Sequence, residues 1–197
     1  MKADCKSRVL AAIRDDHRAL AAVLHGMCFL VRDIRDNDKP ARFDVLRAML
    51  HYIDAFPERH HHPKESRYLF THIRARTGDA DTVLAELEAE HALGGEMIRH
   101  LEQGLLRYEE GGNEYFCAVA TAVEAYSDFH YQHMRKEEDL ILPVAERVLR
   151  EADWAEIDAA FAANEDPLHG FGAHEDFDKL FTRIVALAPP PIGVGPV

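Results

Sequence analysis

Two histidine–glutamate pairs have the clearest chemistry in this chain. His61 and Glu65, and likewise His133 and Glu137, are four positions apart. On an α-helix this spacing places an imidazole and a carboxylate on one face, one turn apart, where both can bind one metal ion or two neighbouring ions. Because the chain has 13 histidines, roughly one such pair is expected from composition alone, so the spacing needs support from its surroundings.

That support is an internal repeat. The segment HHPKESRYLF, which begins at His61, aligns without gaps with HMRKEEDLIL, which begins at His133. Single histidines, His17 and His91, lie 44 and 42 residues before these two segments. Helices of this length would bring four histidines and two glutamates to one depth of the interior, where unpaired polar groups cost several kcal/mol. The pattern therefore predicts a buried metal centre.

The elements that must position these residues are helices. Apolar residues recur at steps of three, four and seven along four long stretches, and no stretch alternates with a period of two. The first stretch should end in the cluster at 36–40, and Pro57 and Pro63 predict a kink or a break midway along the second. The fold class expected is all-α.

The expected architecture is an antiparallel, up-down four-helix bundle over about 5–150, because short loops join the four stretches. Two short C-terminal helices should follow within about 153–187, the first opened by Asp153 as its cap. Residues 1–188 are interpreted as a single domain. Residues 189–197, PPPIGVGPV, are predicted to be a disordered tail.

Composition excludes several classes of function. Of 197 residues, 23 are Lys or Arg and 35 are Asp or Glu, a net charge of −12, so no attraction to nucleic acid or to anionic lipid is expected. Three cysteines without C-x-x-C spacing encode neither a disulfide framework nor a cysteine zinc site. No apolar run of about 18 residues and no secretory signal is visible. We expect a cytoplasmic protein without nucleic-acid or membrane partners.

The motifs, taken in order, resemble a known family. They are DH at 16–17, HHPKESRYLF from His61, EH at 90–91 and HMRKEEDLILP from His133, and together they resemble the hemerythrin-like, or HHE cation-binding, domains. The resemblance implies a four-helix bundle that holds two non-haem iron ions, Fe2+ or Fe3+, with histidines as terminal ligands and two glutamates bridging the irons. The residues to which it gives ligand roles are His17, His61, Glu65, His91, His133 and Glu137.

The chain departs from the family pattern in the third helix. Oxygen-carrying hemerythrins have His-x-x-x-His there, whereas Gly95 stands four residues after His91. His62 is the first candidate for the replacement ligand, because some iron-sensing relatives carry an additional ligand at that place. His130, which lies on the same seam as His133, and solvent are the alternatives.

The resemblance implies a protein that binds O2 or NO, or small anions, at the iron centre, for sensing, storage or delivery. Six or seven ligands exceed one tetrahedral zinc ion and suit two octahedral irons better. Ligands dominated by histidine leave less negative charge on iron, which favours reversible binding. A di-iron redox enzyme (oxidase, peroxidase or NO reduction) and an iron-handling or iron-sulfur cluster repair protein are the alternatives, so the sequence leaves enzymatic activity open.

Overall fold

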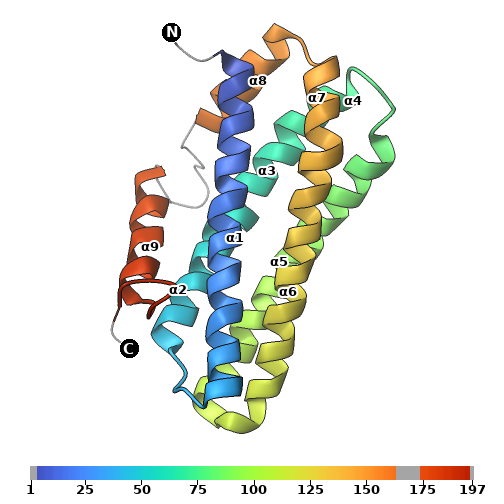
Figure 1. Ribbon diagram of the computed structural model, residues 1–197. Helices are drawn as coiled ribbons and strands as arrows, with labels where there is room; N and C mark the ends of the chain where they lie inside the picture. Colours follow the sequence, from blue (N-terminus) through green and yellow to red (C-terminus); the bar gives the residue numbers. More distant parts are fainter. Residues whose placement is uncertain (1–3, 163–173, 196–197) are drawn as a thin grey trace.

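The computed structural model describes residues 4–162 and 174–195, and all regular secondary structure in these ranges is helical (Figure 1). The α-helices are α1 (Cys5–Asn37), α2 (Phe43–Ile53), α3 (His62–Lys64), α4 (Thr71–Arg74), α5 (Asp81–Gly111), α6 (Phe116–Lys136), α7 (Leu142–Val148), α8 (Glu151–Ala162) and α9 (His174–Leu187). Three π-helical segments, Asp54–His61, Glu65–Phe70 and Glu137–Ile141, and a 3-10 turn, Asn113–Tyr115, connect some of them. The expected all-α class is confirmed.

The long helical stretches lie side by side (Figure 1). Helix α1 packs against α2 and α6, and α5 packs against the same two helices from the other side. The sequence explains α1 well, since the apolar seam that includes Ile13 and Leu24 is buried along its length. Asp4 caps its first turn by accepting the backbone N–H of Ser7 at 2.7 Å. The helix ends at Asn37, within the cluster where the sequence predicts its end.

The second stretch is not broken at its prolines. Residues 43–74 are helical throughout, and π-helical segments alternate with short α-helical ones. Pro57 and Pro63 have no N–H to donate, so the regular ladder of α-helical hydrogen bonds cannot continue through them. The N–H of His62 instead bonds to the carbonyl of Pro57, five residues back. The helix thus continues past its prolines in π-helical turns, where a kink or a break was predicted.

The C-terminal segment differs from the sequence prediction in its details. Helix α8 begins at Glu151, two residues before Asp153, and packs against α1. The carboxylate of Asp153 reaches back to accept the N–H of Arg150 at 2.8 Å and also accepts the guanidinium of Arg76. Asp153 thus caps the helix from its third position, the place that the acidic residue of a capping box takes, and was wrongly predicted to open the helix.

Helix α9 packs against α2, and the chain after it turns back. Residues 189–195 were predicted to be disordered, but Val194 donates its N–H to Val185 at 2.9 Å and Gly195 donates to Ala188 at 2.8 Å. The side chain of Ile192 packs against the apolar core. These contacts explain the difference, because the backbone polar groups find partners on α9. Residues 196 and 197 of the predicted tail lie outside the described residues.

The apolar core of the four stretches has two parts. One cluster includes Leu20 of α1 and Ile98 of α5, and the other includes Ile13 of α1 and Leu87 of α5. On each of these helices a histidine lies between the two clusters, His17 on α1 and His91 on α5. A polar layer therefore crosses the core between two apolar compartments, which exclude water from it on both sides.

Candidate metal centre

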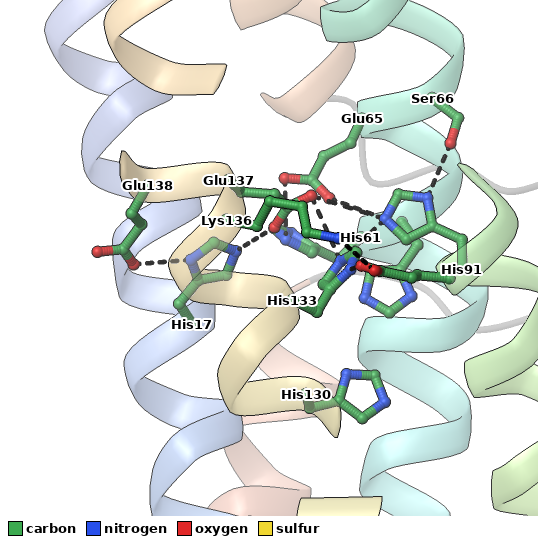
Figure 2. Close-up of polar contacts among 12 residues, drawn as sticks. His17, His61, Glu65, Ser66, His91, His130, His133, Lys136, Glu137 and Glu138 are labelled. Atoms are coloured by element: carbon green, nitrogen blue, oxygen red, sulfur yellow. Dashed lines mark hydrogen bonds and ion pairs between the residues drawn. The ribbon is translucent and has the colours of Figure 1, made fainter. Parts of the chain in front are cut away.

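The polar layer contains the seven residues predicted first as ligands, whereas the alternative ligand His130 lies outside the three sets of neighbouring ligand atoms. His17 comes from α1, and His91 and His133 come from α5 and α6. The other four candidate side chains, His61, His62, Glu65 and Glu137, lie at or next to the ends of π-helical segments. Figure 2 shows imidazoles and carboxylates from different helices converging in one region. Both glutamates are buried, with side chains that are only 1–2% exposed.

Each glutamate faces histidines on two sides. Glu65 lies with Oε1 at 3.3 Å from Nε2 of His61 and with Oε2 at 3.7 Å from Nε2 of His91. Its two oxygens therefore point toward different helices. This is the orientation that a carboxylate needs to bind two neighbouring cations, one through each oxygen.

The second glutamate repeats this arrangement. Oε2 of Glu137 lies 3.1 Å from Nε2 of His17, while Oε1 lies 3.6 Å from Nε2 of His91 and 3.4 Å from Nε2 of His133. The two carboxylates thus stand between one group of histidines, His17 and His61, and a second group that includes His91 and His133. The arrangement matches two cation positions with the carboxylates between them.

The distances among ligand atoms agree with this division. Three sets of three side chains have ligand atoms that all lie within 4.8 Å of one another. These sets are His17 with His61 and Glu65, His62 with His91 and His133, and Glu65 with His91 and Glu137. Glu65 and His91 each occur in two sets, so the sets form one continuous centre with room for more than one ion.

The outer nitrogens of four histidines have hydrogen-bond acceptors. We assign the proton to Nδ1 in His17, His61 and His133, because their partners are carboxylates, which accept and do not donate; the Ser66 hydroxyl beside His91 can accept in the same way. Nδ1 lies 2.8 Å from Glu138 in His17, 2.9 Å from Asp16 in His61, 2.9 Å from the Ser66 hydroxyl in His91 and 2.9 Å from Glu90 in His133. Metal-binding histidines usually donate their second ring N–H in this way, which fixes the ring and leaves the lone pair of Nε2 for the metal.

Nε2 of His91 and Nε2 of His133 lie within hydrogen-bonding distance of each other, at 3.1 Å. Six other inner atoms, in contrast, have no aligned hydrogen-bond partner in the described part of the chain. They are Nε2 of His17 and of His61 and both carboxylate oxygens of Glu65 and of Glu137. Leaving buried polar atoms unsatisfied costs about 1–3 kcal/mol for each, and more for charged groups. A cation among these atoms would satisfy all of them at once, so the residues fit a bound metal.

The charges of the centre also favour a cation. Burial alone would lower the pKa of His133, but the carboxylates of Glu137 and Glu90 outweigh it and raise that pKa to about 9. The same competition raises the pKa of His61, through Glu65 and Asp16. Carboxylates that stabilise a proton on these rings also stabilise a metal ion between them.

His62 lies inside the centre although it directly follows His61. On an ideal α-helix the two side chains would point about 100° apart, but both are buried, with 4% and 3% of His61 and His62 exposed. The π-helical segment that ends at His61 changes the register at this point. The ring of His62 stacks on that of His91 with centroids 4.3 Å apart. Burial lowers the pKa of His62 well below its ordinary value, which favours the neutral, metal-binding form.

Glu58, which lies beside Gly95, is a buried acidic residue that the sequence did not point to. His130 is buried, but it belongs to none of the three sets. Its Nε2 lies 3.3 Å from the carboxylate of Glu58, one turn before His62. The signal that could have revealed Glu58 is its four-residue spacing to His62, the same spacing as in the two histidine–glutamate pairs but in reverse order.

The fold and the site define a helical protein with a buried, histidine-rich cation centre. The family model of the hemerythrin HHE cation binding domain matches residues 8–145, and the chain belongs to this family. The match covers all the candidate ligands. No curated protein and no solved structure gave a significant match. In the described residues, no helix is both long and apolar enough to span a membrane.

Proposed function

We propose that this chain is an up-down four-helix bundle that holds two non-haem iron ions. The observation that carries the proposal is the orientation of Glu65 and Glu137, whose two oxygens each face opposite groups of histidines. In this proposal His17 and His61 would hold one iron, His62, His91 and His133 would hold the other, and the carboxylates of Glu65 and Glu137 would serve both.

The donor set supports iron over zinc. A tetrahedral zinc site takes four ligands, whereas this centre offers five imidazoles and two carboxylates. Imidazole and carboxylate donors in this number suit two ions of higher coordination number. Thiolates are absent from the three sets, which also disfavours an iron–sulfur cluster.

We further propose that the centre binds O2 or NO, for sensing, storage or delivery. When bound, a di-iron centre of this kind supplies a reversible coordination position for such small molecules. The chain contributes the environment of that position. Glu138, Asp16 and Glu90 hold three of the imidazoles in place, and the apolar clusters on either side keep water out.

Rapid mixing with O2 tests this proposal. The protein loaded with Fe2+ should form an adduct that persists for minutes and disappears when O2 is removed, with the reduced protein recovered. Stopped-flow absorption spectroscopy followed by purging with inert gas measures both steps. Rapid, irreversible decay to the oxidised protein would contradict reversible binding and would favour the redox-enzyme or iron-handling alternatives.

Replacement of His62 tests its assignment as the ligand that compensates for Gly95. His62→Ala should reduce the iron content from about two to about one per chain, because only the group with His91 and His133 loses a donor. Gly95→His in that background should recover part of the loss, since a Cβ at Gly95 meets its nearest neighbour, Arg99, at an ordinary 3.5 Å. Elemental analysis after desalting measures the content. Two irons retained in His62→Ala would show that His62 is not a ligand.

A further inference from the structure

Glu58 is a buried carboxylate beside the proposed centre. Its side chain is 4% exposed, and its Oε1 accepts the hydroxyl of Tyr126 at 2.7 Å. Nε2 of His130 lies 3.3 Å from the same oxygen. The other oxygen, Oε2, lies 3.3 Å from Nδ1 of His62. The carboxylate therefore lies between His62 of the centre on one side and Tyr126 and His130 on the other.

The third long helix makes room for this carboxylate. A Cβ added at Gly94 would lie 2.9 Å from Oε1 of Glu58 and 3.2 Å from its Oε2. Contacts this short between non-bonded atoms require a displacement. The absence of a side chain at Gly94 is therefore a condition for the present position of Glu58.

The contact with His62 brings an acceptor to the place where the other histidines of the centre have a hydrogen-bond partner. His17, His61, His91 and His133 each direct Nδ1 to an oxygen acceptor outside the centre. Nδ1 of His62 lies 3.3 Å from Oε2 of Glu58, a close contact without the alignment of a hydrogen bond, whereas the other four distances are hydrogen bonds of 2.8–2.9 Å. A donated Nδ1 proton leaves Nε2 as the nitrogen that binds metal.

We propose that Glu58, seated in the notch at Gly94, is the positioning residue that holds His62 as a metal ligand. This inference rests on the proposed di-iron function. It explains how His62 is held in place of the ligand that the family pattern has at Gly95, the neighbour of Gly94. The space freed on α5 at Gly94 admits a carboxylate from the second helical stretch, and that carboxylate orients an imidazole from its own stretch, one turn further on.

The test compares variants of the full-length chain, loaded with iron without oxygen and then freed of excess metal. Glu58→Ala should release one of its two irons to a chelator about 10–100-fold faster than the wild type, the usual effect of losing an outer partner of a ligand. Glu58→Gln should be closer to the wild type, because its side-chain oxygen can still accept a hydrogen bond from Nδ1 of His62. Glu96→Ala removes an exposed glutamate of α5 and should have no effect.

A double variant separates positioning from direct metal binding. In His62→Ala, the addition of Glu58→Ala should cause no further loss, because the ring that Glu58 positions is already gone. A further loss would show that Glu58 acts independently of His62 and would overturn the inference. Release from Glu58→Ala at the rate of Glu96→Ala would overturn it as well.

Circular dichroism of each variant shows whether it folds. If Glu58→Ala does not fold, Gly94→Ala provides the test instead. It removes no functional group but displaces the carboxylate, so it should also release one iron faster, and a wild-type rate would contradict the inference. The iron content of the wild type separates the proposed di-iron function from the proposed role of Glu58. Fewer than two irons in the wild type would contradict the di-iron function, whereas two irons with unaffected Glu58 and Gly94 variants would contradict only the role of Glu58.

Discussion

Glu65→Ala and Glu137→Ala should each lose both metal ions. Each glutamate faces both groups of histidines, so its removal takes one donor from each proposed ion and the negative charge that offsets their mutual repulsion. The loss should exceed the roughly 10–100-fold effect of an outer partner. Elemental analysis of the reconstituted variants should find well under one iron per chain.

His25→Ala is the matched control for these variants. His25 is an exposed histidine of α1, the helix that also carries His17, and it belongs to none of the three sets. This variant should retain as much iron as the wild type. Equal iron in His25→Ala and in the two glutamate variants, with helical circular dichroism preserved, would refute the assignment of the carboxylates.

The second large effect concerns thermal stability. The iron-loaded protein should melt at a higher temperature than the protein from which a chelator has removed the metal, because the ions bind the folded state and satisfy its buried inner atoms. At a thousandfold excess of free metal over the dissociation constant, this linkage contributes about 4 kcal/mol. For a chain of 197 residues that corresponds to a rise of roughly 8–16 °C.

Differential scanning calorimetry measures this shift. The same comparison on Glu65→Ala provides the control, since a variant that does not bind metal should melt at one temperature with and without added iron. A wild type whose melting temperature is independent of iron would contradict a centre inside the folded core.

Much of the fold follows from periodicity alone. The seam through Ile13 and Leu24 predicts the buried face of α1, and the cluster at 36–40 predicts its end. These predictions succeed because the apolar face of a long helix has only one way to be buried. The second stretch was harder, since a proline inside a helix signals a disturbance without saying which kind. Its widening into π-helical turns depends on neighbours that are distant in the sequence.

In the candidate site, too, the residues that follow a spacing along the chain could be predicted, and those placed by contacts between helices could not. The repeat around His61 and His133, together with the single histidines His17 and His91, identifies six polar residues, and all six meet in one layer. His62 could be proposed only from its position beside His61, because an ideal helix turns it away. Glu58 was missed because its contacts involve Gly94 and Tyr126, which lie on two other helices. The four-residue spacing puts Glu58 on the same helical face as His62, but packing against Gly94 and Tyr126 fixes where its carboxylate lies.

The iron content of the protein tests the central claim most directly. The full-length chain, reconstituted with Fe2+ without oxygen and then desalted, should retain about two irons per chain, and its Mössbauer spectrum should contain two inequivalent sites. The inequivalence is expected because one proposed ion has two histidines and the other has three. Retention of a single ion per chain, or a preference for one zinc ion when both metals are offered, would contradict the account.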